Sequence, residues 1–524
     1  MPQLPPPSSM QPHNDFVKLL AEKVAELHAS QTPFRIYHGN TNSTRTSTKT
    51  FQNSLDVSSL NHVLKVYPDT KKCICEPNVP MESLLWNTMR HKMMPPVVPE
   101  FRGITVGGAF AGTAGESSSF KHGFFDRCVT WFEMILADGT IVTASPSERP
   151  DLFHGAAGTF GTLGVITLLE LDLIEAERHV ELTYHPVTSI SDAVSTISSL
   201  MEADKSGVSP IAFLDGIMYS STSGVVMSGT FLSELPSPDS AVTTFYAASD
   251  PWFYLHAQTR IASSTKTDII PLISYVFRYD RGAFWTGRHA FTYFMTPFNW
   301  VTRYLLDDFM NTRIMYHALH RSGLTNQFII QDMATPASRM TEFSDWLDSP
   351  AGGCGEIYPR WLCPLKAGET VSMSPHLDST TPKPAAQGRL ENGADDFLLN
   401  IGLWGPLPPS AAHNQLGVNR AIEKKLWELE GMKWLYAQTF YTEEEFWRIY
   451  DRKWYAKLRT KYHADGLPDV YQKVGPRAEV LERLQGGGAA MGWYDWVWET
   501  VWPLKGVYGV LSALKGGDYL RKSK

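Results

Sequence analysis

A run of glycines and small hydroxyl residues over positions 99–119 constrains the fold of this chain more than any other segment. The run reads PEFRGITVGGAFAGTAGESSS and has almost no bulky side chain after Phe110. Glycine lacks the Cβ that would block a close approach and readily takes positive φ, so backbone N–H groups in such a loop can reach an anionic ligand. The run therefore predicts a phosphate-binding backbone, with a cofactor pyrophosphate as the expected ligand.

The spacing of these glycines does not match the dinucleotide-binding fingerprint of parallel α/β proteins. That fingerprint places G-x-G-x-x-G directly between a strand and a helix. Here Gly107 and Gly108 are followed by Gly112, Gly115 and a polar stretch without a helical pattern. We therefore expect a phosphate site outside a Rossmann fold. The alternative is that the glycines serve only turns and bulges.

Composition narrows the class of protein. A chain of 524 residues can hold two or three domains with large cores. The formal net charge of -7 argues against nucleic acid as the main partner, because phosphate backbones are bound by basic surfaces. The five cysteines are scattered and odd in number, without a disulfide framework or zinc spacing. We therefore expect a reducing compartment and no metal site.

The sequence shows no secretory or membrane-spanning signal. Residues 1–14 are rich in Pro, Ser and Gln and lack the basic-then-apolar order of a signal peptide. An uninterrupted apolar run of about 18 residues, the length that a spanning helix needs, is also missing. We therefore expect a protein that is soluble or attached peripherally to a membrane.

Periodicity predicts an α+β fold. Apolar spacing predicts a helix over residues 15–27, capped by Asn14 or Asp15, and alternating residues predict strands after it. The further predicted elements are a strand at 34–37, a hairpin at 62–76, a helix at 81–89, a strand at 129–136 with its return at 140–143, and a strand at 165–173 that follows a second glycine-rich loop at 158–164.

The chain divides into four predicted parts. They are a disordered N-terminus at 1–15, a first α+β domain at 16–180, a second, aromatic-rich α+β domain at 181–475, and a Trp-rich C-terminal extension at 476–524. Within the second domain, residues 367–396 are rich in Pro, Ser and Gly, which predicts a surface loop or an insertion.

Several motifs resemble the FAD domain of the vanillyl-alcohol-oxidase superfamily, in order and at suitable spacing. They are residues 104–108, Gly112-Thr113, Gly115, His122-Gly123, Glu133, 136–139, 151–153 and 161–167. The superfamily is large, so this resemblance alone implies only a flavoprotein.

A narrower resemblance is to the Δ24-sterol reductases, the Diminuto/seladin family. Pro99-Glu100 and residues 115–119 and 121–123 are similar to that family's version of the glycine loop. Further motifs of the family resemble residues 278–285, 331–333, 358–364 and 441–447, so the resemblance covers roughly residues 34–475. The family's usual N-terminal hydrophobic anchor has no counterpart here, and the extension after Gly488 has none in the family.

The resemblance implies a PCMH-type FAD-binding domain of two subdomains over 16–180, followed by an α+β substrate (cap) domain over 181–475. It also implies noncovalent FAD, because His38 stands before Gly39 rather than at the position that links the flavin in some members. His122 either lies near the flavin or caps the turn at Gly123. The residues carried over as cofactor-binding are Gly39, Asn40, Thr41, Asn42, Ser43, Gly107, Gly108, Thr113, Gly115, Ser118, Ser119, His122, Gly164 and Ile166.

The implied reaction is reduction of the Δ24 side-chain double bond of a sterol, with NADPH as the electron source. An unactivated alkene accepts hydride poorly, so the site needs an acid beside the developing positive charge and an apolar pocket that excludes water. The candidates for this acid or its orienting partner are Asp280, Tyr279, Asp332 and Tyr441, each with the alternative of a surface or salt-bridged residue. Arg278 and Arg281 either bind a phosphate of the nicotinamide cofactor or are ordinary exposed arginines.

Two aromatic segments point to contact with lipid. Residues 291–310 either line a sterol entrance, rest on a membrane surface or pack in the core. The tail at 493–514, followed by a basic end, fits an interfacial membrane anchor, with docking onto its own catalytic domain as the alternative. The implied location is the cytoplasm, or a peripheral position on the cytosolic face of the endoplasmic reticulum membrane.

Two other functions remain open. One is an oxidase of the same superfamily that acts on an alcohol or a sugar, and the other is a catalytically silent protein that binds lipid as a scaffold. The motifs after residue 275 favour the reductase over the oxidase, because they resemble only the narrower family. The intact glycine loops argue against a silent protein.

Overall fold

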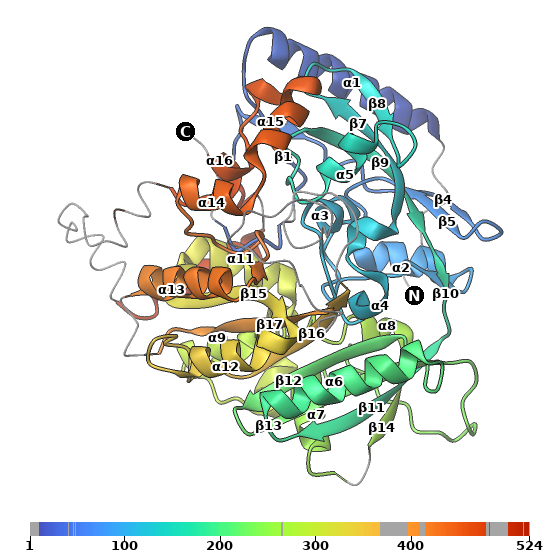
Figure 1. The fold of residues 1–524 in the computed structure, drawn as a ribbon, viewed down its shortest axis with the longest axis vertical. Helices are drawn as coiled ribbons and strands as arrows, with labels where there is room; N and C mark the ends of the chain where they lie inside the picture. Colours follow the sequence, from blue (N-terminus) through green and yellow to red (C-terminus); the bar gives the residue numbers. More distant parts are fainter. Residues whose placement is uncertain are drawn as a thin grey trace.

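The computed structural model describes residues 10–39, 41–45, 47, 49–263, 266–366, 397–408, 414–477, 482, 501–516 and 518–522. The fold is α+β, as predicted, and it is built on two large antiparallel sheets that lie in two halves of the molecule (Figure 1). The N-terminal residues, blue to cyan in the figure, form the upper half. The green to yellow residues form the lower half, and helices α14 to α16 return to the upper one.

The sheet of the first half has five strands in the order β4-β5-β9-β7-β8, and each neighbouring pair is antiparallel. Its strands are β4 (Val63–Tyr67), β5 (Lys72–Cys75), β7 (Val129–Leu136), β8 (Ile141–Ala144) and β9 (Gly164–Asp172). These bounds confirm the predicted hairpins and the predicted strand at 165–173. Antiparallel pairing also distinguishes this sheet from the parallel sheet of a Rossmann domain.

Smaller elements surround this sheet. They are β1 (Arg35–Tyr37) paired in parallel with β3 (Ser54–Asp56), β6 (Met93–Met94) paired with β10 (Ile174–Glu175), α2 (Met81–Met89), α4 (Ser119–His122), η1 (Phe125–Cys128) and α5 (Pro150–Ala156). The predicted strand at 34–37 and the predicted helix at 81–89 are therefore confirmed.

Helix α1 (Met10–Ala29) begins five residues before the predicted start at Asp15, so residues 10–15 are helical rather than disordered. The cause is a buried contact that periodicity cannot show. The ring of His13 lies 2.8 Å from Glu76 Oε1 and 3.3 Å from Glu133 Oε1. Burial opposes the charged ring, but the hydrogen bonds to Glu133 and Glu76 outweigh it and raise the pKa of His13 to about 9. A charged His13 thus fastens the first turns of α1 to the sheet.

The glycine run contains a short helix that the sequence did not predict. Helix α3 (Val106–Ala111) starts at Thr105, whose Oγ1 accepts a hydrogen bond from the N–H of Gly108 at 3.2 Å. Glycine in a helix interior is unfavourable by about 1 kcal/mol relative to Ala, so Gly107 and Gly108 argue against a helix on propensity alone. Tertiary packing overrides that preference, because a Cβ on Gly107 would lie only 2.7 Å from Pro77 Cβ.

The sheet of the second half has eight strands in the order β14-β11-β13-β12-β16-β17-β15-β18, again with antiparallel neighbours. The strands are β11 (His179–Val187), β12 (Phe213–Ser220), β13 (Ser223–Leu232), β14 (Thr267–Pro271), β15 (Phe328–Pro336), β16 (Arg360–Lys366), β17 (Phe397–Pro406) and β18 (Met432–Lys433).

The two faces of this sheet have different partners, because successive side chains of a strand point to opposite faces. On one face, residues such as Leu362, Ile401 and Met333 form a core with helices α6 (Ile190–Lys205), α12 (Met340–Asp348) and α13 (Gln415–Glu428). On the other face, Trp361 and Cys363 join the core that extends into the first half. This second face therefore meets the glycine-rich segments.

The remaining helices connect and cover the two halves. They are α7 (Phe253–Arg260), α8 (Leu272–Val276), α9 (Thr286–Tyr293), α10 (Trp300–Leu305), η2 (Asp307–Met310), α11 (Thr312–Ser322), η3 (Leu324–Gln327), η4 (Ala337–Arg339), α14 (Glu443–Ile449), α15 (Arg452–Lys461), η6 (Ala464–Gly466) and α16 (Val470–Val474).

The described part of the C-terminal extension docks onto the rest of the chain. Helix α19 (Leu504–Lys515) packs on α11, and β19 (Arg521–Lys522) pairs in parallel with β2 (Lys49–Thr50). Trp493, Trp496 and Trp498 lie outside the described residues. No helix in the described part of the chain is long and apolar enough to cross a bilayer.

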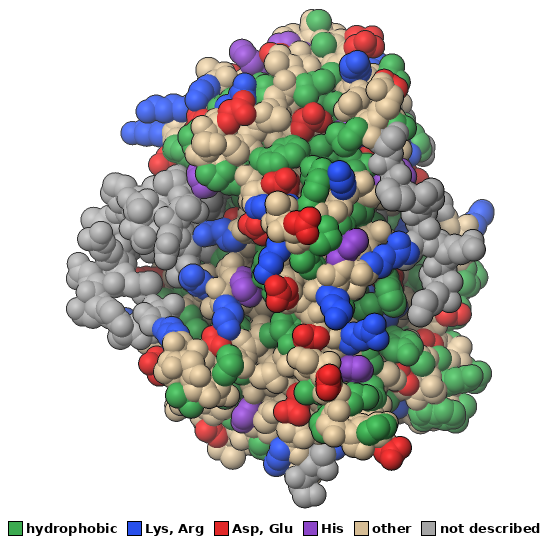
Figure 2. All heavy atoms as spheres, turned by 90° about the vertical axis from the view of Figure 1, so that its right-hand side faces the viewer, with side chains coloured by type: hydrophobic (Ala, Val, Ile, Leu, Met, Phe, Trp, Pro, Cys, Tyr) green, Lys and Arg blue, Asp and Glu red, His purple; other side chains and the backbone are tan. Residues whose placement is uncertain are grey.

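Charged side chains of both signs are mixed on the face that Figure 2 shows. Lysine and arginine alternate there with aspartate and glutamate, and hydrophobic side chains lie between them. This face therefore does not present the continuous basic stripe that a nucleic acid would require.

Candidate active site

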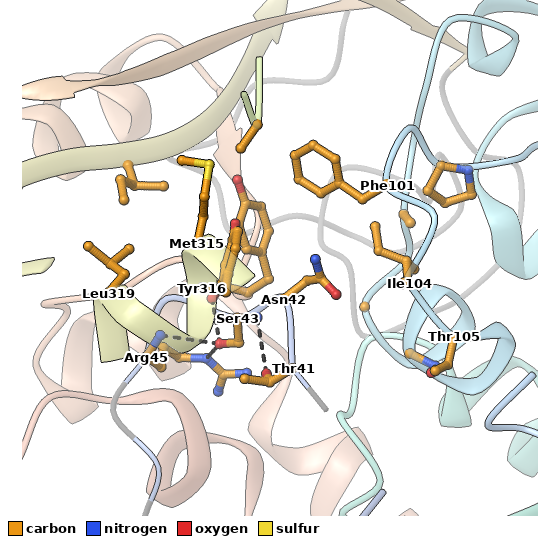
Figure 3. A pocket seen from close by; sticks show the side chains of 18 of the residues that line it. Thr41, Asn42, Ser43, Arg45, Phe101, Ile104, Thr105, Met315, Tyr316 and Leu319 are labelled. Carbon is orange, nitrogen blue, oxygen red and sulfur yellow. Dashed lines mark hydrogen bonds between the residues drawn. The ribbon is translucent and has the colours of Figure 1, made fainter. Parts of the chain in front are cut away.

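A cavity of about 900 Å³ is lined by residues of both halves. The first half contributes the loop at 41–45, the glycine run and the 159–166 segment, and the second half contributes strands β15 to β17 and helices α9 and α11. Figure 3 shows Met315, Tyr316 and Leu319 of α11 on one side of the space, facing Phe101 and Ile104 on the other. The cavity has a basic part and an apolar part.

The glycines of the lining are needed for close packing. A Cβ on Gly164 would lie 2.6 Å from the carbonyl oxygen of Ile135, and one on Gly115 would lie 3.2 Å from side-chain carbons of Leu365 and Phe124. Gly161 has a φ of +71°, a conformation that other residues rarely adopt. Backbone thus forms much of the surface of the cavity on the side of the first half.

Four cationic side chains line the basic part of the cavity: Arg35, Arg45, Lys49 and Lys473. Arg45 Nε donates to Ser43 Oγ at 3.0 Å, and its Nη1 donates to the carbonyl oxygen of Lys473 at 3.2 Å. Burial and the neighbouring positive charges lower the pKa of Lys49 to about 8 and that of Arg45 to about 10, and they hold the pKa of Lys473 well below its usual value. This mutual repulsion is relieved when an anion binds among the four groups.

Three buried polar atoms of the lining have no hydrogen-bond partner among the described residues. They are His38 Nδ1, Glu100 Oε1 and Asn400 Oδ1. Burial, with Lys49 and Lys473 nearby, lowers the pKa of His38 to about 3, so its ring is neutral. Burial, reinforced by Glu116, raises the pKa of Glu100 well above its usual value. Unpartnered buried polar atoms are unfavourable, and a polar ligand in the cavity would satisfy them.

These observations fit FAD. The backbone of the first half and the four cations suit a pyrophosphate, and the unpartnered atoms suit the polar edges of a heterocyclic ring. The residues that would hold the cofactor therefore lie on the wall that the first half contributes, together with Lys473 from α16.

Asp332 lies on β15 and lines the cavity. Among the described residues of the second sheet, it is the one acidic residue that does so. Its Oδ2 accepts a hydrogen bond from the Tyr436 hydroxyl at 2.6 Å, and its Oδ1 accepts one from Asn400 Nδ2 at 3.2 Å. Burial raises the pKa of Asp332 to about 6, although the bonds from Tyr436 and Asn400 oppose this shift. Asp332 can therefore hold a proton near neutral pH.

The apolar part of the cavity is aromatic and aliphatic. Phe284 and Trp404 lie with ring centroids 4.3 Å apart, and Trp361 lies 6.0 Å from Trp404. Further apolar lining comes from Ala290, Phe291, Phe294, Leu306, Phe309, Met310, Ile314, Met315, Leu319, Val507, Val510 and Leu511. Of the predicted segment 291–310, some residues, such as Phe291 and Phe309, line the cavity. Others, such as Met295 and Leu305, are exposed.

The structure places about half of the predicted site residues in the lining. Those that line the cavity are Thr41, Asn42, Ser43, Gly107, Gly108, Gly115, Gly164, Ile166 and Asp332. Those that lie outside the lining are Gly39, Thr113, Ser118, Ser119, His122, Asp280, Tyr279 and Tyr441. Asn40 lies outside the described residues.

The serines at the end of the glycine run hold the loop itself. Ser118 Oγ donates to the carbonyl oxygen of Pro96 at 2.6 Å and also contacts Glu116, while Ser119 Oγ accepts a hydrogen bond from the N–H of Glu116 at 2.9 Å. Thr113 accepts a hydrogen bond at its carbonyl oxygen from Trp434 Nε1 at 2.9 Å. Their hydrogen bonding thus shapes the turn, and none of these three residues faces the cavity.

Tyr279 and Arg278 belong to a buried hydrogen-bonded group around Asp215. Asp215 Oδ2 accepts from Arg278 Nη2 and from the Tyr279 hydroxyl, both at 2.8 Å, and from Trp361 Nε1 at 3.0 Å. Arg281 is likewise occupied, by Asp307 at 2.8 Å. Neither arginine is therefore an exposed phosphate ligand, nor an ordinary surface residue.

The other predicted acids, and the predicted cofactor residue His122, do not line the cavity either. Asp280 accepts a hydrogen bond from the N–H of Arg102 at 3.2 Å, and burial raises its pKa to about 6 without placing it in the lining. Tyr441 is buried, and burial raises the pKa of its hydroxyl well above the usual value. His122 is half-buried, and burial lowers its pKa.

Sequence reasoning did not find several lining residues: Arg35, Arg45, Lys49, Lys473, Glu100 and Tyr436. Single basic residues on strands and helices carry no local signal, and Lys473 is more than four hundred residues from Arg45 in the chain. The return of α16 to the first half brings Lys473 to the other three cations.

Comparison with known proteins first defines the class. Residues 17–145 match the family described as FAD binding domain. Together with the geometry above, this match identifies the chain as an FAD-binding protein, as the glycine loops predicted.

Longer matches, over about four fifths of the chain, then give more specific relatives. The Delta(24)-sterol reductase of Homo sapiens is 29% identical over 427 residues, which cover 79% of this chain and 76% of that protein. The Delta(24)-sterol reductase of Arabidopsis thaliana is 28% identical over 441 residues, which cover 80% and 76%. A shorter match, 31% over 98 residues, is to cytokinin dehydrogenase 9 of Oryza sativa subsp. japonica. The chain is therefore a relative of the Δ24-sterol reductases, and the resemblance predicted from the motifs is confirmed.

Replacing Lys473 by Met should weaken FAD binding about tenfold, which corresponds to about 1.4 kcal/mol, because one of the four charges around the anion is lost. The dissociation constant is measured by titrating FAD-depleted protein and following flavin fluorescence. Lys461→Met is the matched control, because Lys461 is exposed on α15 and pairs with Asp151. Equal affinities in both variants would contradict a role of the cationic group in cofactor binding.

Proposed function

We propose that this chain is an FAD-dependent oxidoreductase that reduces the Δ24 side-chain double bond of a sterol, with NADPH as the source of electrons. The observation that carries the proposal is that one cavity combines a basic, backbone-rich wall with an apolar wall on which an acid is placed. The named relatives support the choice of substrate. The volume of about 900 Å³ is at the upper end of the range of about 300–1,000 Å³ for small-molecule sites, as a site for a cofactor and a substrate requires.

The first half would hold FAD noncovalently. Thr41, Asn42 and Ser43 would contact it from the first loop, and the backbone at Gly107, Gly108, Gly115, Gly164 and Ile166 would surround it. When bound, FAD supplies hydride that it has received from NADPH. The overall balance is one NADPH and one proton consumed for each C=C bond that becomes CH–CH.

The second half would supply the proton. Asp332, held between Tyr436 and Asn400, keeps a proton beside the cavity because burial raises its pKa to about 6. The proton passes to one carbon of the alkene, directly or through the Tyr436 hydroxyl, while hydride is added to the other carbon. Asp332 is then reprotonated from solvent for the next turnover.

The aromatic wall would stabilise the positive charge that develops when the alkene is protonated. The faces of aromatic rings attract cations, by about 2 kcal/mol or more where water is excluded. Phe284, Trp361 and Trp404 line the cavity and contact one another, so they offer such faces without a nucleophile that would trap the cation. The same apolar surface excludes water from the reacting carbons.

The proposed function is tested by incubating purified protein with NADPH and desmosterol and analysing the sterol product. We expect loss of the bound flavin's absorbance on anaerobic addition of NADPH, followed by a product saturated at the side-chain double bond. Peroxide formation from an alcohol without a response to NADPH would instead indicate an oxidase. Protein without bound flavin would indicate a silent scaffold.

Asp332→Asn should reduce the rate of desmosterol reduction by about 100-fold or more, the range expected for loss of a general acid. In the wild type, the rate should fall as the pH rises through about 6, because only the protonated carboxyl can donate. The variant should lose this dependence. Initial rates of product formation between pH 5 and 8 measure both effects.

Asp280→Asn is the control for this pH profile, because burial raises the pKa of Asp280 to about 6 as well, yet Asp280 does not line the cavity. This variant should keep the pH dependence of the wild type. If Asp280→Asn abolishes the dependence and Asp332→Asn keeps it, the assignment of the acid is wrong.

The function also requires access to a lipid-soluble substrate, and we propose a peripheral contact with the cytosolic face of the endoplasmic reticulum membrane. Apolar side chains are exposed beside the cavity on and near α10, with Met295 72%, Leu305 69% and Trp300 54% exposed. Trp502 and Leu511 of the C-terminal extension are exposed as well. Exposed apolar and aromatic residues of this kind favour the membrane interface. The free thiols of all five cysteines suit the reducing cytosolic side.

Replacing both Val301 and Leu305 by Asp should at least halve the fraction of protein that floats with phosphatidylcholine vesicles containing cholesterol, because two charges would enter the interface. The control is Val208→Asp, at an apolar residue that is 81% exposed after α6, far along the chain from α10. Equal flotation of the double variant and the control would contradict this contact surface.

A further inference from the structure

The described C-terminal residues, 501–516 and 518–522, contribute one wall of the apolar part of the cavity. Gly506, Val507, Val510 and Leu511 of α19 line the cavity, and so does Leu520 beyond the helix. Val510 is half-buried, whereas Val507 and Leu511 are partly exposed at the same surface. Val510 is therefore the most enclosed of these three side chains.

Two glycines one turn apart allow α19 to pack closely against Tyr293 and helix α11. A Cβ on Gly506 would lie 2.3 Å from Tyr293 Cε1, and one on Gly509 would lie 2.6 Å from the carbonyl oxygen of Ala318 on α11. Trp502 Nε1 also donates to the carbonyl oxygen of Tyr293 at 2.6 Å. Because the helix backbone contacts its neighbours so closely, the side chains of Val507 and Val510 have a fixed position at the cavity.

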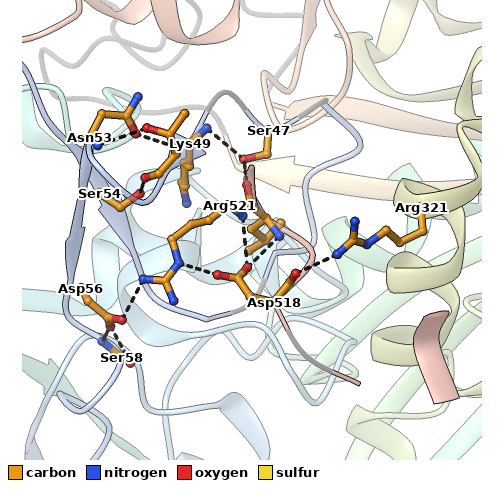
Figure 4. A network of polar contacts seen from close by, with 11 residues as sticks. Ser47, Lys49, Asn53, Ser54, Asp56, Ser58, Arg321, Asp518 and Arg521 are labelled. Carbon is orange, nitrogen blue, oxygen red and sulfur yellow. Dashed lines mark hydrogen bonds and ion pairs between the residues drawn. The ribbon is translucent and has the colours of Figure 1, made fainter. Parts of the chain in front are cut away.

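The end of the segment is fastened to the first half (Figure 4). Strand β19 pairs with β2, and Arg521 binds Asp518 and, at 3.3 Å, Asp56 Oδ2. Arg321 of α11 donates to the carbonyl oxygen of Asp518 at 2.8 Å. The segment is thus held both on α11 and on the strand that carries Lys49.

We propose that α19 determines which sterols the enzyme accepts, with Val510 as the main specificity-determining residue. The proposal rests on the proposed function in taking the apolar ligand to be the reacting sterol. Lanosterol carries three methyl groups on its ring system that desmosterol lacks, so the two sterols differ in bulk while sharing the Δ24 double bond. If the rigid wall formed by α19 contacts the sterol rings, it distinguishes the two sterols by the space that the extra methyl groups need. A single methylene group in an apolar pocket changes binding by about 10- to 200-fold.

Val510→Phe tests the wall by narrowing the cavity. We expect the ratio of kcat/KM for lanosterol to that for desmosterol to fall at least tenfold. Val510→Ala widens the cavity and should raise the same ratio, so the proposal stays testable if the larger side chain prevents folding. Leu514→Phe is the control, because Leu514 is exposed on the same helix and does not line the cavity.

The dissociation constants of the two sterols, measured by equilibrium binding to FAD-loaded protein, provide a readout that does not depend on turnover. If the wild type binds both sterols but reduces neither, the proposed reaction is wrong. The ratio of the two dissociation constants then still tests whether Val510 determines sterol specificity. An unchanged ratio in both Val510 variants, in binding and in turnover, would overturn the proposal. Failure of the wild type to bind either sterol would overturn both proposals.

Discussion

The buried ion pair between Asp215 of β12 and Arg278 positions the aromatic wall on which the site depends. One oxygen of Asp215 accepts hydrogen bonds from Arg278, Tyr279 and Trp361, and the Arg278 guanidinium lies over the rings of Tyr275 and Tyr279 at 4.0 and 4.6 Å. Two charges this far from water are tolerated only as a pair, and removing one partner typically destabilises a protein by about 3–5 kcal/mol. The same group fastens Trp361 and the segment that leads to Phe284, so it places the rings that line the cavity.

The two halves contribute different chemistry to one cavity. In the first half, glycines let the backbone line the cavity, and cations from β1, β2 and α16 line its basic part. In the second half, alternation along the strands turns one set of side chains towards covering helices and the other set towards the cavity. A polar cofactor and an apolar substrate can therefore meet at a boundary that neither half forms alone, and the C-terminal helix completes the apolar side.

Elements that depend on local patterns were predicted correctly from the sequence. Features that depend on contacts between distant parts of the chain were not. The hairpin at 62–76 and helix α2 follow from alternation and apolar spacing within a few residues. The start of α1 depends on Glu76 and Glu133, which lie far along the chain from His13, so periodicity placed it too late. Helix α3 was missed because its glycines are poor helix formers, and the contact with Pro77 that demands them is tertiary. In the site, the loop at 41–43 and the glycines were predicted, whereas Lys473 and Tyr436 carry no local signal.

The sequence by itself indicated the cofactor class and the resemblance to the Δ24-sterol reductases, because glycine spacing and the hydroxyl-rich loop are local properties of the chain. Only the tertiary structure decided which acid lines the cavity. Asp280 and Asp332 are both buried carboxyl groups whose pKa burial raises to about 6. Asp280 accepts a hydrogen bond from the backbone of Arg102, whereas the alternation of β15 turns Asp332 towards the cavity. That difference depends on strand pairing and packing across the two halves, which no neighbouring residue in the sequence encodes.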